Sequence, residues 1–211
     1  MTEYKYIVIE GNIGAGKTSL ATALSKDWNS RLILEEFADN PFLPKFYKNA
    51  ERYAFPLELS FLSERFSQLK KELSNDDLFS PTVVADYMIS KCQIFAKNNL
   101  QEDEYHLFLK MYELVESNIR KPDLLVYLYK DVSKLLENIK KRGRDYEQKI
   151  EASYLENIQS QYLEFIRQHE DQRIVLVDTT HLDFVNEESD YLWLKEIILK
   201  EYPVGLTRIE K

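Results

Sequence analysis

Short runs of apolar residues alternate with longer, helix-length segments along this chain. The runs are bounded by turn-forming residues and have the length of buried parallel strands. An alternation of this kind is typical of an α/β layered fold, in which helices cover a parallel sheet. We therefore predict five strands, at Tyr4–Ile9, Arg31–Leu34, Thr82–Ala85, Asp123–Tyr129 and Arg173–Val177.

The segments between the expected strands have the length of helices. Asn40 and Pro41 interrupt the segment after the second strand. We expect the chain to loop there over the carboxyl edge of the sheet, where open α/β sheets bind ligands. The predicted helices are Lys17–Trp28, Phe55–Leu73, Ile89–Asn99, Glu102–Ile119, Val132–Lys141 and Ile150–His169, and a last one can form at Glu187–Lys200.

The length and composition favour one domain over residues 1–211. The chain has 211 residues, of which 44% are hydrophobic, and this suffices for one core without a second domain. No segment rich in Ser, Gly or Pro separates one half from the other. We therefore expect a single globular unit with no linker and no internal repeat.

Charge and cysteine content limit which cellular compartment and which binding partners we expect for the protein. The formal net charge of −8 argues against non-specific binding of nucleic acid, which needs a broad positive surface. No apolar run approaches the roughly 18 residues of a membrane span, and the first residues lack the pattern of a secretory signal. The one cysteine, Cys92, suits a reducing compartment. We expect a soluble cytoplasmic protein that binds small molecules and neither nucleic acid nor membranes.

The segment Gly11–Thr18 carries the clearest chemistry in the sequence. It reads GNIGAGKT and matches the phosphate-binding pattern G-x-x-x-x-G-K-[ST], with an expected strand before it and an expected helix after it. Backbone N–H groups and the helix N-terminus bind phosphates, Lys17 reaches the β- and γ-phosphates, and the Thr18 hydroxyl is offered to Mg²⁺. We predict that ATP binds at Gly11, Asn12, Ile13, Gly14, Ala15, Gly16, Lys17, Thr18 and Ser19.

The phosphate loop alone does not say where the γ-phosphate goes, because switches, motors and kinases share it. The tetrapeptide Asn-Lys-x-Asp, with which GTPases read guanine, does not occur in the sequence. A motor or regulatory ATPase without a small acceptor stays open as an alternative, and it would consume ATP with no nucleoside present.

A basic segment in the second half of the chain can close over the phosphates. It reads KKRGRDYEQKI, at Lys140–Ile150, and lies between two expected helices. Arg142 and Arg144 flank Gly143, so their guanidinium groups can clamp a transferring phosphoryl group and neutralise its charge. The simpler interpretation is a basic helix end that complements the helix dipole. Together with the phosphate loop, a lid over about residues 141–150 is favoured, with both arginines in the catalytic set.

Several motifs together resemble the P-loop deoxynucleoside kinase family, most closely its bacterial purine-deoxynucleoside members. The resemblance runs nearly end to end. It implies a three-layer fold with a five-stranded parallel sheet, an ATP- and Mg²⁺-dependent kinase that acts on the 5′-hydroxyl of a 2′-deoxynucleoside in salvage, and a homodimer. The motifs are the phosphate loop, LEEFADNPFLPKFY at Leu34–Tyr47, RYAFPLELSFLSERF at Arg52–Phe66, VVADYMISKCQIFA at Val83–Ala96 and the lid.

The resemblance also implies roles at the transfer site. Glu35 matches the catalytic carboxylate that accepts the proton of the 5′-hydroxyl, and Glu36 is its rival. Asp86 matches a residue that holds Mg²⁺, although an Asp at a strand end can also cap a helix. In the family an arginine commonly follows this acidic residue, whereas this chain has Tyr87. A phosphate contact is therefore missing, or it comes from another residue such as Arg65.

The resemblance places the nucleoside between the second strand and the lid. Tyr47 and Glu147 match the pair that holds the 3′-hydroxyl of the sugar. Glu58 and Arg65 are seven residues apart and so share one helix face, where they either line a pocket or reach solvent from an amphipathic boundary. Phe95 falls where the family stacks an aromatic ring on the base, although an aromatic at helical spacing is more often part of a core.

Glu58 bears on the choice of base, because many family members have Gln at this position. An ionised Glu can only accept hydrogen bonds, and guanine offers two adjacent donors. A protonated Glu58 regains a donor and can pair with adenine as Gln does. We expect deoxyguanosine and deoxyadenosine about equally, ahead of pyrimidines. The alternatives are a deoxycytidine or thymidine kinase and a thymidylate-type nucleoside monophosphate kinase, the latter disfavoured by the pattern FPLELSF at residues 55–61.

Overall fold

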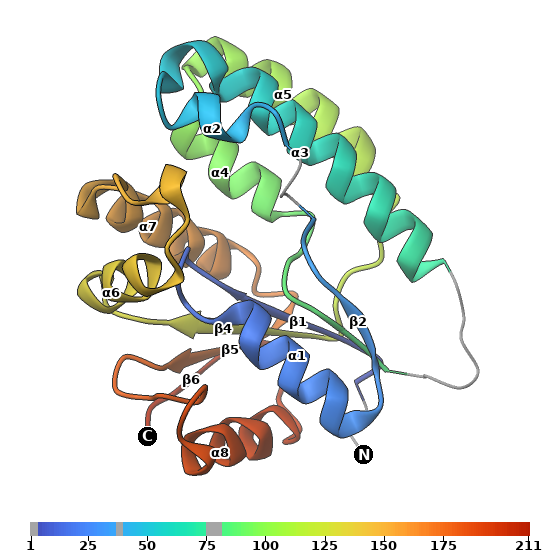
Figure 1. Cartoon of the computed structure of the whole chain (residues 1–211). Coiled ribbons are helices and arrows are strands. Elements are labelled where there is room, and N and C mark those ends of the chain that lie inside the picture. Colours follow the sequence, from blue (N-terminus) through green and yellow to red (C-terminus); the bar gives the residue numbers. More distant parts are fainter. Residues whose placement is uncertain (1–3, 37–39, 75–81) are drawn as a thin grey trace.

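The computed structural model of the chain describes residues 4–36, 40–74 and 82–211. Within these residues a parallel sheet of six strands runs through the centre of the molecule, in the order β2-β3-β1-β4-β5-β6 (Figure 1). The strands are β1 (Tyr6–Gly11), β2 (Arg31–Ile33), β3 (Val83–Ala85), β4 (Leu124–Tyr129), β5 (Arg173–Asp178) and β6 (Gly205–Ile209).

Helices cover both faces of the sheet, which confirms the predicted three-layer arrangement. In Figure 1, α3, α4 and α5 lie above one face, whereas α1 and α8 lie below the other. No helix in the described part of the chain has both the length and the apolar character to cross a membrane. The helices are α1 (Lys17–Trp28), α2 (Leu43–Phe46), α3 (Ala50–Leu73), α4 (Lys91–Asn99), α5 (Glu102–Glu116), α6 (Val132–Arg142), α7 (Ala152–Gln168) and α8 (Glu188–Ile198), with a 3₁₀ turn η1 (Asp145–Glu147).

Strand β1 shows why the apolar runs are continuous rather than alternating. Tyr6 and Val8 enter the core cluster on the side of α3, α4 and α5, whereas Ile7 and Ile9 enter the cluster on the side of α1 and α8. Successive side chains of a strand point to opposite faces, so a strand covered on both faces is apolar at every position. All four residues are buried.

The prediction of five strands was wrong by one, because β6 at the edge of the sheet was missed. This strand pairs with β5 in parallel and has only that one neighbour. Its sequence, GLTRI, alternates half-buried and exposed positions instead of forming an apolar run. An edge strand with exposed alternate positions lacks the continuous apolar signal by which the other five strands were recognised.

Helix boundaries differ from the prediction mainly at α3, which begins at Ala50 rather than Phe55. Asn49 caps it, because its side chain accepts a hydrogen bond from the backbone N–H of Arg52 at 3.3 Å. Pro56 therefore lies inside the first turns of the helix. Helix α5 ends at Glu116, three residues before the predicted end, and the short α2 was not predicted. Residues 37–39 of the motif at Leu34–Tyr47 lie outside the described residues.

The sheet order brings three chemically important segments to one edge. Strands β2, β3 and β1 are neighbours and run parallel, so their carboxyl ends lie together. The phosphate loop follows β1, Glu35 follows β2 and Asp86 follows β3 directly. A ligand at this edge therefore meets all three segments at once.

Candidate active site

The phosphate loop has the backbone geometry that only glycine adopts easily. Gly14 and Gly16 have φ values of 85° and 93°. A Cβ atom on Gly14 would lie 2.8 Å from the carbonyl oxygen of Leu135, and one on Gly16 would lie 2.7 Å from the ring of Phe184. The loop is thus held close to α6 and to the segment before α8, and side chains at these glycines would distort it.

Lys17, the first residue of α1, folds back over the loop. Its ammonium group donates hydrogen bonds to the carbonyl oxygens of Gly11 at 2.9 Å and Asn12 at 3.0 Å. Burial, followed by repulsion from Lys91, lowers the pKa of Lys17 to about 8. A half-buried ammonium group held against a phosphate-binding loop is an arrangement that binds phosphate anions.

A large open cavity extends from the phosphate loop toward α6 and the segment between β5 and α8. Its volume is about 1810 Å³, including the space at its mouth. The segment at residues 180–186 was missed by the sequence analysis, because it carries no motif. We call this space the donor cavity, and its walls include Gly14, Ala15, Gly16, Lys17, Thr18, Ser19, Lys134, Asn138, Lys141, Arg142, Arg144, His181, Asp183, Phe184 and Asn186.

A second cavity, of about 770 Å³ with its mouth, lies between α2, α3, α4, α7 and the lid. It contains every residue that the resemblance assigned to the nucleoside. Phe95 is one of these, and its ring also packs edge-on against the core residue Tyr162 at 6.3 Å between centroids. We call this space the acceptor cavity, and its walls include Glu35, Tyr47, Leu57, Glu58, Phe61, Arg65, Asp86, Lys91, Phe95, Asn99, Glu147 and Tyr154.

The two cavities meet at a small set of side chains. Lys17, Thr18, Arg142 and Arg144 line both of them. Three of these residues are cationic, and the fourth offers a hydroxyl group. A phosphoryl group that passes from one cavity to the other therefore crosses a positively charged boundary, where its charge is stabilised.

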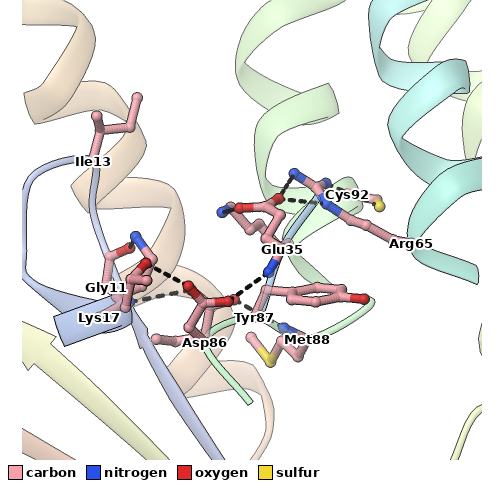
Figure 2. Close-up of polar contacts among 12 residues, drawn as sticks. Gly11, Ile13, Lys17, Glu35, Arg65, Asp86, Tyr87, Met88 and Cys92 are labelled. Carbon is pink, nitrogen blue, oxygen red and sulfur yellow. Dashed lines mark hydrogen bonds and ion pairs between the residues drawn. The ribbon is translucent and has the colours of Figure 1, made fainter. Parts of the chain in front are cut away.

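Glu35 lies on the acceptor side of this boundary with both carboxylate oxygens engaged. Arg65 binds Oε1 through Nε at 2.8 Å, and Lys91 binds Oε2 at 2.5 Å (Figure 2 shows the Arg65 pair). Burial by itself raises the pKa of Glu35, but the charges of Lys91 and Arg65 outweigh it and hold the pKa well below the usual range. Glu36 is exposed instead. The structure thus brings Glu35, and not its rival, to the cavity.

Asp86 links the phosphate loop to Glu35. Its Oδ2 accepts a hydrogen bond from the hydroxyl of Thr18 at 2.5 Å, and its Oδ1 accepts one from the backbone N–H of Glu35 at 2.8 Å. A hydroxyl and a carboxylate oxygen beside a phosphate site are ligands that suit Mg²⁺, which is usually held by one or two protein oxygens together with phosphate. Among the described residues no group of three or more His, Cys, Asp and Glu side chains forms a fuller metal site.

Tyr87 takes no part in the phosphate site. Its side chain is buried, and its hydroxyl donates to Oε1 of Gln68 on α3 at 2.5 Å. In Figure 2 the hydroxyl end of Tyr87 points away from Lys17. The sequence analysis considered Arg65 as the source of the missing phosphate contact. Arg65 instead donates from Nε to Glu35 and from a terminal nitrogen to the sulfur of Cys92, at 3.1 Å. A second cation beside Glu35 is Lys91, which the sequence analysis missed.

The predicted lid follows α6 and turns at Gly143, which has a φ of 73°. Glu147 is buried and forms ion pairs with both lid arginines, Arg142 and, at 3.2 Å, Arg144. The resemblance assigns Glu147 to the sugar hydroxyl, but here its carboxylate holds the arginines. Tyr146 stacks on Tyr47 at 5.8 Å between ring centroids, so the lid contacts the wall of the acceptor cavity directly.

Glu58 lies deep in the acceptor cavity, only 1% exposed. Its Oε1 accepts a hydrogen bond from Asn99 at 2.7 Å, and Asn98 donates to the other end of the Asn99 amide at 2.9 Å. Oε2 is buried and has no hydrogen-bond partner among the described residues. Burial raises the pKa of Glu58 to about 7. The pocket-wall interpretation of Glu58 is thus favoured over an exposed position.

Comparisons with known proteins agree with this geometry. The family model described as deoxynucleoside kinase matches residues 7–201. A deoxyguanosine kinase of Bacillus subtilis is 39% identical over 195 residues, which cover 90% of this chain and 94% of the relative. A deoxyguanosine kinase of Lactobacillus acidophilus is 32% identical and covers 97% and 92% of the two chains. A structure of deoxyadenosine kinase from M. mycoides, with the products dCMP and dCDP, aligns with a TM-score of 0.80 and 26% identity over 92% of this chain and 98% of that one.

Proposed function

Because the chain belongs to the deoxynucleoside kinase family, we propose that it transfers the γ-phosphate of ATP to the 5′-hydroxyl of a purine 2′-deoxynucleoside, in deoxynucleotide salvage. The observation that carries this proposal is the pair of cavities that meet at Lys17, Thr18, Arg142 and Arg144. ATP fits the open donor cavity with its phosphates on the loop. The nucleoside fits the acceptor cavity, where Glu35 stands beside the boundary.

The transfer needs little covalent chemistry from the protein. Glu35 accepts the proton of the 5′-hydroxyl as the oxygen attacks the γ-phosphorus, and ADP leaves from the opposite side. Lys17, with Arg142 and Arg144, stabilises the negative charge on the moving phosphoryl group. For this step the two lid arginines exchange Glu147 for phosphate oxygens, so lid closure and ATP binding are coupled.

Mg²⁺ is the proposed cofactor, supplied with ATP. Thr18 and Asp86 are the residues that would hold it, because their oxygens already meet beside the phosphate loop. When bound, the ion neutralises charge on the β- and γ-phosphates. In its absence the hydrogen bonds of Asp86 keep Thr18 and the backbone of Glu35 in place.

The acceptor cavity offers a sugar site and a base site. We assign the 3′-hydroxyl to Tyr47 and Glu147, which line the acceptor cavity from the end of α2 and from the lid. We assign the base to Phe95, whose ring lines the cavity, and to the unpartnered Oε2 of Glu58. A buried carboxylate oxygen without a donor is costly, and a donor on the base edge removes that cost. Ionised Glu58 suits guanine, and protonated Glu58 suits adenine.

The remaining properties follow from the family and from the surface. We propose a cytoplasmic homodimer in which residues 1–211 act as one kinase domain, with small molecules rather than nucleic acid or membranes as partners. An apolar stripe on α5 supports the dimer: Leu107, Met111 and Leu114 are 51%, 41% and 75% exposed and share one helix face. A second copy of the chain would cover it.

Measurement of ADP release with and without acceptor tests the proposed reaction class. We expect ADP to form only when a 2′-deoxynucleoside is present, since the acceptor cavity must be filled for transfer. A motor or regulatory ATPase would release ADP at the same rate without any nucleoside. Such a result would contradict the proposed function.

A further inference from the structure

In the arrangement that the structure shows, two cations make the carboxylate of Glu35 a weak base, because they stabilise its ionised form. Arg65 occupies Oε1 and Lys91 occupies Oε2, and both side chains are buried. The proton of the 5′-hydroxyl needs one of these oxygens. If the chain is the proposed kinase, on which this inference rests, the departure of one of the two cations when the substrates bind makes Glu35 a stronger base.

Arg65 is held too firmly to be the cation that leaves. Two of its nitrogens, Nε and one terminal nitrogen, bind Oε1 of Glu35, and the other terminal nitrogen donates to the sulfur of Cys92. Its guanidinium group also lies over the ring of Phe61, 4.5 Å from the centroid. A planar group fixed at three nitrogens and stacked on a ring is suited to orienting Glu35, and not to moving.

Lys91 is held by fewer contacts. Its ammonium group lies over the ring of Phe95, 5.6 Å from the centroid, and within the described residues Glu35 is its one ion-pair partner. Its flexible side chain ends in a compact group with three donors. The side chain is buried in the wall of the acceptor cavity, which the four residues at the boundary also line. Its charge acts on Lys17 strongly enough to be the main influence on that pKa after burial. Lys91 is therefore close to the path of the phosphoryl group.

We propose that Lys91 is a further catalytic residue, which moves from Glu35 to the transferring phosphoryl group when both substrates are bound. The movement frees Oε2 of Glu35 to take the proton of the 5′-hydroxyl. The bond between the 5′-oxygen and the γ-phosphorus forms, and the bond from that phosphorus to the β,γ-bridging oxygen breaks with its electron pair going to ADP. Lys91 stabilises the charge on the phosphoryl oxygens throughout. This role supplies the phosphate contact that Tyr87 does not make.

Replacement of Lys91 by Met tests the proposal, with Lys97→Met as the control. Lys97 lies on the same helix, has a side chain that is 40% exposed, and pairs with Glu164 at 2.9 Å on the surface. For Lys91→Met we expect kcat to fall on the order of 10²-fold or more. The KM for the deoxynucleoside and the affinity for ATP should change by less than about fivefold, because Lys91 reaches the phosphoryl group only during transfer. Lys97→Met should match the original protein.

A second readout separates contact with phosphate from a role in merely orienting Glu35. ADP with aluminium fluoride, Mg²⁺ and the deoxynucleoside mimics the phosphoryl group in transfer. Lys91→Met should weaken binding of this complex by about the same factor as it lowers kcat. If kcat falls but the fluoride complex binds with unchanged affinity, Lys91 acts only through Glu35 and the proposal is wrong.

Further results would separate a folding defect in the variant, a failure of the proposal about Lys91, and a failure of the proposed kinase function. If Lys91→Met does not fold, as judged by circular dichroism, Lys91→Gln repeats both measurements with a polar, uncharged group at the same position. A variant with normal kcat overturns the proposal about Lys91 while leaving the kinase function intact. If the original protein itself transfers no phosphate to a deoxynucleoside, the proposed function fails instead.

Discussion

Glu35 is the residue on which the proposed chemistry depends most directly. The change Glu35→Gln keeps the shape of the side chain but removes its ability to take a proton. We expect turnover to fall on the order of 10²-fold or more, measured as kcat with saturating ATP and deoxynucleoside. Glu36→Gln is the matched control, because Glu36 is exposed. Loss of turnover in Glu36→Gln with near-normal Glu35→Gln would shift the assignment by one residue.

We predict that Glu58 makes the choice between purines depend on pH. Burial raises the pKa of Glu58 to about 7, and the negative charge of Glu35 raises it further. The hydrogen bond from Asn99 and the positive charges of Arg65 and Lys91 lower it and offset only part of this effect. Above this pH Glu58 is ionised and accepts from guanine, and below it the protonated form can pair with adenine. We predict that the ratio of kcat/KM for deoxyguanosine to that for deoxyadenosine rises between about pH 6 and pH 8. A ratio that does not change with pH would contradict this role.

The change Glu58→Gln provides the companion measurement. An amide does not titrate, so the ratio of the two purines should lose its dependence on pH. Preference should also shift from guanine toward adenine or cytosine by about 1–3 kcal/mol, because hydrogen bonds to guanine are left unpaired. Equal kcat/KM ratios in the two proteins, across all four deoxynucleosides, would remove Glu58 from the base site.

Among individual residues, the sequence analysis identified those to which the family resemblance assigned a role. It missed those whose roles arise from packing in the folded chain. Glu35, Glu58 and Tyr47 were placed in the cavity in advance because the family resemblance marked their positions. Lys91 lies within the motif at Val83–Ala96 and Asn99 lies outside it, but the resemblance assigned a role to neither, and their partners lie 56 and 41 residues away. The one available signal was a lysine within the apolar segment YMISKCQIFA, where an unpaired charge would be costly.

At the scale of elements, the stacking of Tyr146 on Tyr47 connects the lid to the wall of the acceptor cavity. The change Tyr47→Phe removes the hydroxyl that we assign to the sugar but keeps the stacked ring. We predict a higher KM for the deoxynucleoside with unchanged affinity for ATP, both measured by titration calorimetry and steady-state kinetics. An equal loss of affinity for both substrates would show that the hydroxyl supports the lid and not the sugar.

Elements with a strong hydrophobic pattern were predicted well, and the others were not. Strands buried on both faces, such as β1 and β4, gave apolar runs that matched the structure closely. The edge strand β6 has one covered side and no such run. The start of α3 depends on a side-chain cap by Asn49 and on a proline tolerated in the first turns, neither of which alters the apolar spacing.

At the scale of the whole molecule, the exposed stripe on α5 predicts how two copies associate. The change Leu114→Glu places a charge on the most exposed residue of the stripe. We expect the original protein to sediment with twice the mass of one chain, and Leu114→Glu to sediment as a monomer, because the charge would be buried in the interface. Val204→Glu, at an exposed apolar position just before β6, should leave the dimer intact. A monomeric original protein would contradict the proposal.

The most direct test of the proposed function uses ATP labelled with ³²P at the γ-phosphate and measures which product receives the label. We predict that the label passes to deoxyguanosine and deoxyadenosine and is recovered in their 5′-monophosphates, with less transfer to deoxycytidine and thymidine. The 2′,5′-dideoxy analogue of each purine nucleoside, which fits the same cavity but lacks the 5′-hydroxyl, should receive no label. Transfer only to nucleoside monophosphates, or release of labelled phosphate to water whichever nucleoside is present, would contradict the account.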